Sequence, residues 1–234
     1  MHRHGQAACH VRPEGRDRPM SRLIVQMQMS IDGFVDSDVP GSRWQLWDWG
    51  PNWTWSADAR ARFNALFASA SGILLSRPMA GEGYLTHWRR TAEQHPDEPD
   101  YEFAARIGRL PKFVVTEHHV ADQPGTKVIN GSFAEAVRQA KHAVDGNLIC
   151  FGGAGFVAAL LQHHLVDELQ LYVNPGLAGH GARIFGDTLA RDRFTLLDAT
   201  PTACGILITR WNPTRPEHPS DVAAVELPAW EGIE

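Results

Sequence analysis

The sequence predicts an α/β protein with a mostly parallel central sheet flanked by helices and a C-terminal antiparallel pair of strands. Short apolar runs typical of buried strands alternate with runs of helical period through most of the chain. This alternation is the pattern of a parallel sheet whose strands are joined by helices. Two strand-like runs near the end, 194–197 and 205–211, follow each other without a helical run between them, which predicts the antiparallel pair.

Length and composition favour one folded domain in a reducing compartment. The chain has 234 residues, of which 43% are hydrophobic, enough to bury a full core. A net charge of −5 offers no general attraction for nucleic acid, and no apolar run approaches the ~20 residues that span a bilayer. Three scattered cysteines without a C-x-x-C pair indicate neither a disulfide framework nor a thiolate metal site. We therefore expect a cytoplasmic protein that binds neither nucleic acid nor membrane.

The two ends differ from the middle of the chain. Residues 1–19 are rich in Arg and His and poor in aliphatic residues, so we expect a flexible leader rather than a secretory signal. Met20, directly before the first apolar run, is equally suited to be the true start. Residues 213–234 combine prolines with acidic residues, which predicts a tail. The folded domain is therefore predicted to span 20–212.

The first predicted strand, 23–29, is apolar apart from two alternating glutamines, and it stops at the turn pair Asp32-Gly33. The stretch 40–56 holds five of the eight tryptophans among Gly and Pro without a helical or strand period. A long loop is predicted there.

A helix is predicted over 57–70, because apolar residues recur there at helical spacing. We place Ser56 as its N-cap and Gly72 as the residue that ends it. A short buried strand follows at 73–75. Pro78 then opens another helix, since proline fits the first helical turn.

Farther along, 86–100 is charged and contains proline, which predicts a surface connection to a short helix around 101–107. Residues 112–116 and 127–129 are the next predicted strands. Ser132 is the predicted N-cap of another amphipathic helix.

The last strand-and-helix unit begins with a buried strand at 147–151. A glycine-rich run over 152–155 follows it and leads into a helix. Residues 165–173 supply one further strand before the closing pair.

Two strand-to-helix turns are candidate anion sites, because helix N-termini at the carboxyl ends of strands present free N–H groups. In one turn, Gly152 and Gly153 allow a pyrophosphate to approach the backbone without meeting a Cβ. In the other, Ser76 and Arg77 precede a helix, and the arginine fork suits a phosphate monoester such as a 2′-phosphate. The structural alternatives, a tight turn without ligand and a solvated arginine, stay open.

Several motifs occur in an order and spacing that span most of the chain. They are S-I-D-G at 30–33, L-L-S-R at 74–77, K-F-V-V-T at 112–116, I-C-F-G-G at 149–153, L-V-D-E-L at 165–169, and the run from Pro175 through Gly179 and Gly181 to Phe185. With them, residues 22–212 resemble the dihydrofolate reductase fold. The resemblance is to the branch formed by the C-terminal reductase domain of riboflavin-biosynthesis deaminase/reductases and its stand-alone relatives.

The resemblance implies NADPH binding and hydride transfer to a small planar heterocycle, pterin-like or aminopyrimidine-like, by a homodimer. Arg77 and Thr116 would face the adenosine 2′-phosphate, with Ser76 in the same turn. Asp32-Gly33 would form the loop beside the nicotinamide, and Asp58 would hold the substrate ring. The expected pyrophosphate site consists of Gly152, Gly153, Ala154, Gly155 and Phe156.

Asp32 and Asp58 are the candidate catalytic residues. Hydride transfer from a nicotinamide needs no protein nucleophile, but it needs two rings held in contact away from water and a group that orients or protonates the substrate. A carboxylate bonded to ring nitrogens in an apolar pocket has a raised pKa and suits the second task, which we assign to Asp58. The alternatives are an ordinary helix N-terminal acid for Asp58 and an ordinary turn residue for Asp32.

The tryptophans of the predicted loop have two possible roles. They line the substrate site, where their faces stack on a planar ring, or they are structural and cover a dimer surface or anchor the loop. They are Trp44, Trp47, Trp49, Trp53 and Trp55. The 12 histidines predict no metal site, because the adjacent pairs at 118–119 and 163–164 lack the i, i+4 spacing of metal ligands. His180, between two glycines, is the histidine best suited to lie near a ligand. Covalent catalysis is not supported, since no G-x-S-x-G motif occurs and Cys150 lies in a buried strand.

Two hypotheses about function remain. The first is a stand-alone NADPH-dependent reductase, and the second is a non-catalytic nucleotide- or ligand-binding protein that keeps the fold. Ser76 and Met79 support the second, because the family turn usually begins with Gly and has Thr two residues after the arginine. The zinc pattern of the deaminase domain, H-x-E with P-C-x-x-C, is missing, so we do not expect the bifunctional enzyme.

Overall fold

The computed structural model describes residues 21–36, 54–81, 83–116, 125–185 and 193–214. The predicted leader and Met20 lie outside these ranges, as does the predicted tail beyond Thr214. Four of the five loop tryptophans and the histidine pair at 118–119 also lie outside them.

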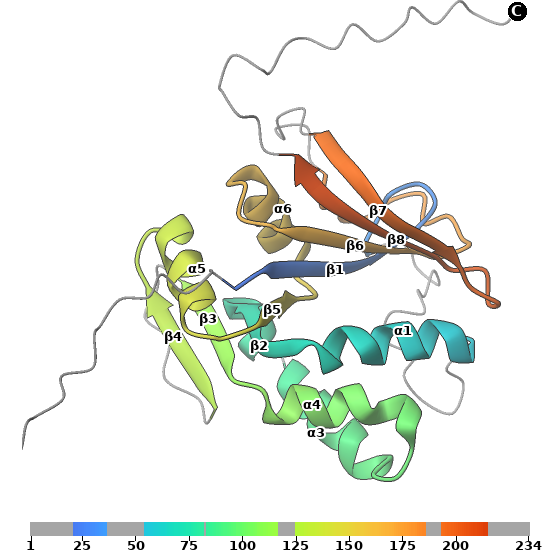
Figure 1. Cartoon of the computed structure of the whole chain (residues 1–234), viewed down its shortest axis with the longest axis horizontal. Coiled ribbons are helices and arrows are strands. Elements are labelled where there is room, and N and C mark those ends of the chain that lie inside the picture. The colour runs from blue at the N-terminus through green and yellow to red at the C-terminus, as the bar shows by residue number, and fades with distance from the viewer. Residues whose placement is uncertain (1–20, 37–53, 82, 117–124, 186–192, 215–234) are drawn as a thin grey trace, which may run out of the picture.

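One eight-stranded sheet organises the described chain, in the order β4-β3-β2-β5-β1-β6-β8-β7 (Figure 1). The strands from β4 to β6 pair in parallel, and β8 pairs antiparallel with both β6 and β7. Both the mostly parallel sheet and the C-terminal antiparallel pair are therefore confirmed. The strands are β1 (Leu23–Met29), β2 (Ala70–Ser76), β3 (Lys112–Thr116), β4 (Thr126–Asn130), β5 (Asn147–Cys150), β6 (Glu168–Val173), β7 (Arg193–Pro201) and β8 (Leu207–Thr214).

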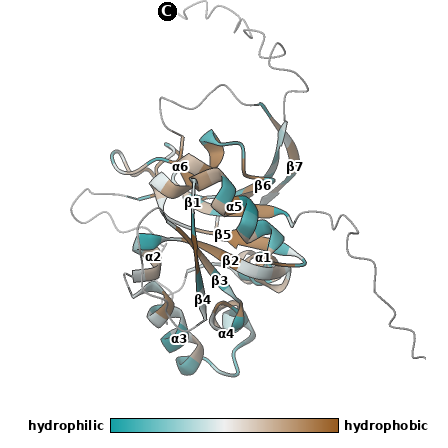
Figure 2. Ribbon diagram, turned by 90° about the vertical axis from the view of Figure 1, so that its left-hand side faces the viewer, coloured by the Kyte–Doolittle hydropathy of each residue, from teal (hydrophilic) through white to brown (hydrophobic). Residues whose placement is uncertain are grey.

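Helices cover both faces of the sheet. They are α1 (Ala57–Ala68), α2 (Arg77–Gly81), α3 (Tyr84–Gln94), the 3-10 helix η2 (Pro99–Tyr101), α4 (Glu102–Arg109), α5 (Phe133–His142) and α6 (Ala154–Gln162). One buried cluster joins α1, α3 and α4 to one face, and a second joins α5 and α6 to the other (Figure 1). The central strands are hydrophobic where these layers meet them (Figure 2). The core thus has two layers of helix around one sheet.

The residues of β1 alternate between the two clusters. Ile24 belongs to the α1/α3/α4 cluster, whereas Leu23 and Val25 belong to the α5/α6 cluster. Because successive side chains of a strand point to opposite faces, Gln26 and Gln28 lie on the side of Ile24. Both glutamines are buried there.

The predicted end of the first helix is wrong. α1 ends at Ala68, and Gly72 lies inside β2, which is longer than the predicted strand. A Cβ at Gly72 would lie 2.9 Å from the side chain of Val144 and 3.0 Å from that of Phe113. Gly72 therefore allows close packing between strand and neighbours, rather than helix termination.

The predicted surface connection at 86–100 is wrong over most of its length, because α3 occupies it. Tyr84, Trp88 and Thr91 are buried on one side of this helix. The ring of Trp88 packs edge-on against Phe103 of α4, with centroids 5.1 Å apart. The high charge of the segment is confined to the outer face of an amphipathic helix.

Trp55 is the one loop tryptophan among the described residues, and it is a core residue. Its ring is 1% exposed, stacks on Tyr172 at a centroid distance of 5.5 Å and meets Phe63 edge-on at 5.6 Å. Trp55 therefore anchors the end of the predicted loop in the core.

The carboxylate of Glu168 ties the central strands to the C-terminal pair. It is fully buried and accepts hydrogen bonds from Arg22 at 2.8 Å, Gln170 at 2.8 Å and Arg210 at 2.7 Å. Burial alone would raise its pKa, but these donors lower the pKa of Glu168 below its ordinary value. This network is structural, since it lies outside the lining of the main cavity.

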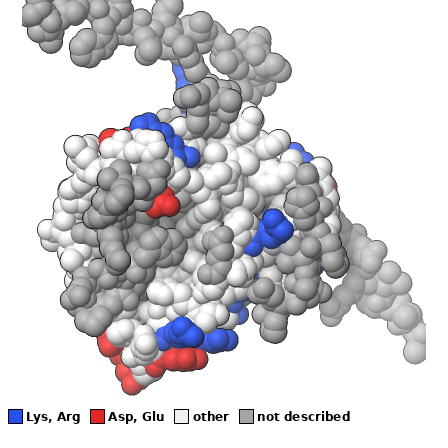
Figure 3. All heavy atoms as spheres, turned by 180° about the vertical axis from the view of Figure 1, so that it is seen from behind, with Lys and Arg blue, Asp and Glu red and all other residues white. Residues whose placement is uncertain are grey.

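The antiparallel pair extends beyond the predicted domain end, because Pro213 lies in β8 opposite Phe194. On the face shown in Figure 3, acidic and basic side chains lie in small groups, and the middle of that face is largely uncharged. No helix among the described residues has the length and apolar character needed to cross a membrane.

Candidate functional site

A cavity of about 1010 Å³ opens where β1, β2, β3 and β5 end. We divide its lining into two parts. The turn half contains Ser76, Arg77, Thr116, Phe133 and the run Gly152–Phe156. The aromatic half contains Gln26, Gln28, Phe63, Tyr84, His87, Trp88 and Phe151.

The two predicted anion turns lie side by side. β2 and β5 are adjacent parallel strands, so the turns that follow them emerge at the same edge of the sheet. A Cβ at Gly153 would lie 3.1 Å from Oγ of Ser76. Eight of the nine predicted cofactor-binding residues line the one cavity, the exception being Gly33.

Gly153 is required by backbone conformation. It stands at the N-cap of α6 with φ of 76° and ψ of 94°, a region that residues with a Cβ rarely adopt. The first N–H groups of α6 lie at this end, where they and the helix dipole favour an anion. The backbone at Gly153 therefore fits a phosphate group.

Gly152 also allows a close side-chain contact. A Cβ there would lie 2.8 Å from Sδ of Met79, so the side chain of Met79 packs directly on this glycine. Met79 is itself buried. Its thioether covers Gly152, while Gly153 and the start of α6 continue the cavity lining.

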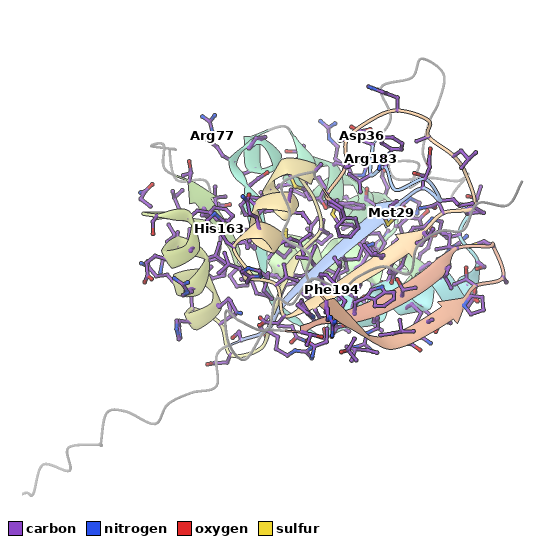
Figure 4. The ribbon with its side chains drawn as sticks, turned by 90° about the horizontal axis from the view of Figure 1, so that it is seen from above. Met29, Asp36, Arg77, His163, Arg183 and Phe194 are labelled. Carbon is purple, nitrogen blue, oxygen red and sulfur yellow. The ribbon has the colours of Figure 1, made fainter. Side chains whose placement is uncertain are left out.

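Ser76, Arg77 and Thr116 occupy the ends of two neighbouring strands. The buried hydroxyl of Ser76 accepts a hydrogen bond from the N–H of Met79 at 3.4 Å and so caps α2. Arg77 is exposed at the start of α2, and Figure 4 shows its side chain projecting away from the ribbon. Thr116 is buried at the end of β3, the strand next to β2. The guanidinium is thus accessible to a ligand at the cavity edge.

Asp32 holds two loops together rather than lining the cavity. Its carboxylate accepts hydrogen bonds from the N–H groups of Ala178 at 3.0 Å and Gly179 at 2.8 Å. A hydrogen bond with the Ser30 side chain, followed by these N–H groups, lowers the pKa of Asp32 to about 2. Among the described residues, Asp32 and Gly33 are not part of the lining.

The same loop nevertheless reaches the cavity mouth. Val35 and Asp36 line the cavity, and so does Ala182 from the facing loop, whose carbonyl accepts the N–H of Val35 at 2.8 Å. The guanidinium of Arg183 lies over the ring of Phe34, 4.0 Å from its centroid. Figure 4 shows Asp36 and Arg183 in this region, so Asp32 fixes the mouth indirectly.

The environment expected for Asp58 is wrong. Its exposed carboxylate accepts hydrogen bonds from the N–H groups of Ala59 at 3.0 Å and Ala203 at 3.1 Å, in the turn between β7 and β8. The pKa of Asp58 is lowered, chiefly by a hydrogen bond with the Ser56 side chain, whereas we expected a raised pKa in an apolar pocket. Asp58 is not among the residues that line the cavity. The first turn of α1 therefore binds the turn of the β7–β8 hairpin.

Sequence reasoning missed Gln26 and Gln28, whose side chains are 3% and 5% exposed. Within the described part of the chain, Nε2 of Gln26 and Oε1 of Gln28 have no hydrogen-bond partner. The two glutamines alternate with apolar residues in the run 23–29. This alternation predicts a strand, but it does not assign a role to the glutamines.

His87 was also missed, because it lies in the segment predicted as a connection. Its Nε2 is buried and has no hydrogen-bond partner among the described residues. Burial lowers the pKa of His87 below 6.5, so the ring is neutral at pH 7. Burial likewise raises the pKa of Tyr84 well above its usual value. Both side chains are therefore uncharged at pH 7.

Metal and nucleophile chemistry find no support in the described residues. No group of three or more His, Cys, Asp or Glu side chains there is placed to hold a metal ion. His163, His164 and His180 are exposed and outside the cavity lining. Cys150 is buried, and burial raises the pKa of its thiol to about 12.

Comparison with known proteins agrees with this architecture. Residues 21–208 match the model of a family described as the RibD C-terminal domain. The chain is 20% identical over 196 residues to the uncharacterized protein YyaP of Bacillus subtilis (strain 168), covering 82% of this chain and 95% of YyaP.

Two solved structures share the fold at low identity. One is a diaminohydroxyphosphoribosylaminopyrimidine deaminase/5-amino-6-(5-phosphoribosylamino)uracil reductase from Thermotoga maritima, with a TM-score of 0.57 and 12% identity over 83% of this chain and 57% of that one. The other is a dihydrofolate reductase from Enterococcus faecalis in complex with NADP(H), with a TM-score of 0.51 and 11% identity over 83% of this chain and 97% of that one.

Proposed function

The chain belongs to the RibD C-terminal domain family, and from this membership and the cavity geometry we propose that it is an NADPH-dependent reductase. Its substrate is a small planar heterocycle, pterin-like or aminopyrimidine-like. The family and the structural neighbours support a reductase fold, and the dihydrofolate reductase neighbour binds NADP(H). We propose that this chain likewise binds NADPH and uses it to reduce its substrate.

The residues of the turn half fit a dinucleotide phosphate. Gly153 adopts the positive φ that places the first N–H groups of α6 at the cavity, which suits a pyrophosphate. Arg77 offers an exposed guanidinium at the same cavity, with Thr116 nearby on the next strand, which suits a 2′-phosphate. Phe133 and Phe156, packed edge-on with centroids 5.6 Å apart, add an apolar wall.

The aromatic half suits the reacting ring. When bound, NADPH supplies a hydride from its nicotinamide ring. Tyr84 and Phe151, with ring centroids 5.3 Å apart, and the buried Trp88 present flat apolar surfaces that orient a planar substrate and exclude water. The neutral ring of His87 lies in the same half and can donate or accept a hydrogen bond there.

The adjacency of the two turns within one cavity is the single observation that carries the proposal. Quenching of tryptophan fluorescence by NADPH tests binding, since Trp88 lines the cavity. Oxidation of NADPH at 340 nm with pterin and aminouracil substrates tests turnover. The absence of any fluorescence response at millimolar NADPH would reject the proposal.

The second candidate is a binding protein without turnover. One observation favours it. The only carboxylate in the described lining is that of the exposed Asp36. Asp58, which we expected to hold the substrate ring, binds the turn between β7 and β8 instead. NADPH binding without oxidation by any of these substrates would support this candidate. Oxidation above the background rate would exclude it.

We also propose that the protein forms a homodimer, as the family resemblance implies. Light scattering of the full chain in solution tests this. A mass near 25.9 kDa, that of one chain, would contradict it.

A further inference from the structure

We propose that Gln26 and Gln28 determine substrate specificity, by reading an uncharged cyclic-amide edge in which a carbonyl lies beside an N–H. The inference rests on the proposed function for the identity of the ligand as the reacting heterocycle. It assigns a recognition role to two side chains of the aromatic half, both of which come from β1.

Two polar atoms without partners point to a ligand. Buried amide groups are almost always hydrogen-bonded in folded proteins, because an unpaired one loses its bonds to water without replacement. Nε2 of Gln26 and Oε1 of Gln28 lack partners in the described chain, although the two side chains are 3% and 5% exposed. Both residues line the cavity, so a ligand there can supply the missing bonds.

A third buried glutamine shows that such atoms can be satisfied within this sheet. Gln170 of β6 lies beside Gln26 in register, and its Nε2 donates a hydrogen bond to Glu168 at 2.8 Å. Gln170 does not line the cavity. Among these three glutamines, the polar atoms without partners therefore belong to the two that face the cavity.

The unpaired donor and the unpaired acceptor of the pair define the complementary ligand group. Residues two apart on a strand point to the same side and lie ~7 Å apart along it. The amides of Gln26 and Gln28 present one free donor and one free acceptor. Rotation of both amides exchanges the donor and the acceptor, so the pair can meet such an edge in either orientation. A ring edge with an adjacent carbonyl and N–H matches this pair.

The surroundings favour a neutral, planar ring. Phe63, Tyr84 and Trp88 are buried in the same half, and their faces suit stacking against a flat heterocycle. The carboxylate of Asp36, the only one in the described lining, is on an exposed residue at the mouth. A cationic ring would therefore lose its hydration without gaining a buried counter-charge.

Two probes and matched variants of the full chain test the inference. The probes are 6-aminouracil and 6-amino-1,3-dimethyluracil, which differ only by methyl groups that remove both ring N–H donors. We expect the unmodified chain to bind 6-aminouracil at least about tenfold more tightly in calorimetric titration. Gln26→Met and Gln28→Met keep the side-chain length but remove the amide, and each is expected to weaken 6-aminouracil about tenfold, or ~1.4 kcal/mol.

Gln170→Met is the matched control. It removes another buried amide, on the neighbouring strand and outside the cavity lining, so 6-aminouracil binding is expected to stay unchanged. Glu168 loses a hydrogen bond in this variant, so its melting temperature is expected to fall more than those of the two β1 variants. If the substitutions weakened 6-aminouracil binding only by destabilising the fold, Gln170→Met would weaken it most.

The inference is overturned if the unmodified chain does not distinguish the two probes, or if Gln26→Met and Gln28→Met retain that distinction. NADPH titrations on the same samples separate this result from the proposed function. Normal NADPH binding with no probe discrimination would remove the role of the glutamines alone. Probe discrimination that depends on the glutamines, without NADPH binding, would leave their role intact and remove the reductase.

Discussion

The two halves of the cavity are built in different ways. In the turn half, the conformation of Gly153 and the first N–H groups of α6 create the site, so backbone supplies most of the chemistry. In the aromatic half, side chains from β1 and α3 create it, among them the buried Gln28 and Trp88 and the half-buried His87. The first half presents helix N–H groups to an anion, and the second presents aromatic side chains that suit a planar ring. A backbone site depends on a few local conformations, whereas a side-chain site depends on which distant elements pack together.

The largest expected effect comes from adding a side chain to the turn half. Gly153→Val places a β-branched residue at φ of 76° and sets a Cβ 3.1 Å from Oγ of Ser76. We expect loss of about 1–3 kcal/mol of unfolding free energy and loss of NADPH quenching at concentrations that saturate the unmodified chain. Denaturant unfolding and fluorescence titration measure the two effects.

Gly108→Val is the control for this change. Gly108 lies in α4, and a Cβ there would meet nothing within 4 Å. Stability and NADPH binding are expected to be retained. Equal NADPH affinity in Gly153→Val and Gly108→Val would show that the turn half does not rely on this backbone.

Arg77→Ala removes the one strong charge that we assign to the turn half. Hydrogen bonds to charged groups contribute about 1.5–3 kcal/mol, so NADPH is expected to bind roughly 10- to 100-fold more weakly. NADH lacks the 2′-phosphate and should be affected little. Arg138→Ala, an exposed arginine on α5, controls for the general loss of positive charge. An equal loss for NADPH and NADH would reject the 2′-phosphate role of Arg77.

His87 tests whether the aromatic half is dry. Its folded pKa lies below 6.5 because burial disfavours the charged ring. Below pH 6.5 the unfolded chain therefore binds more protons, and stability falls as the pH drops through the folded pKa. NMR titration of the imidazole should give a pKa below 6.5, and His87→Gln should remove this part of the pH dependence. An imidazole pKa of 6.5 or higher would mean that water reaches this half freely.

The smallest expected effect concerns the mouth that both halves share. Asp32→Asn weakens the bonds to Ala178 and Gly179. The pKa of Asp32 is lowered from 3.8 to about 2, so its ionised form stabilises the fold above pH 4 and this contribution is lost as the pH falls toward 2. Melting temperatures of the two proteins should differ at pH 7 and converge in acid. A difference that stays constant down to pH 2 would contradict the role of the carboxylate charge.

Sequence patterns predicted the features that depend on near neighbours. The glycine turn after β5, the helix opened by Pro78 and the turn at Asp32 each follow from residues adjacent in the chain. α3 was missed because charge along the segment outweighed the spacing of Tyr84 and Trp88, and the helix is stabilised by packing on α4.

The sequence by itself determined the order of the strands and of the helices other than α3, and the position of the glycine turn, because backbone preference and apolar period are local properties. The tertiary structure alone decided that Asp58 serves the hairpin, since its partner Ala203 is 145 residues away. It also decided that, among the described residues, Nε2 of Gln26 and Oε1 of Gln28 have no hydrogen-bond partner, whereas Nε2 of Gln170 donates to Glu168. The environment of a polar side chain is set by whichever distant elements surround it, and no local pattern encodes those neighbours.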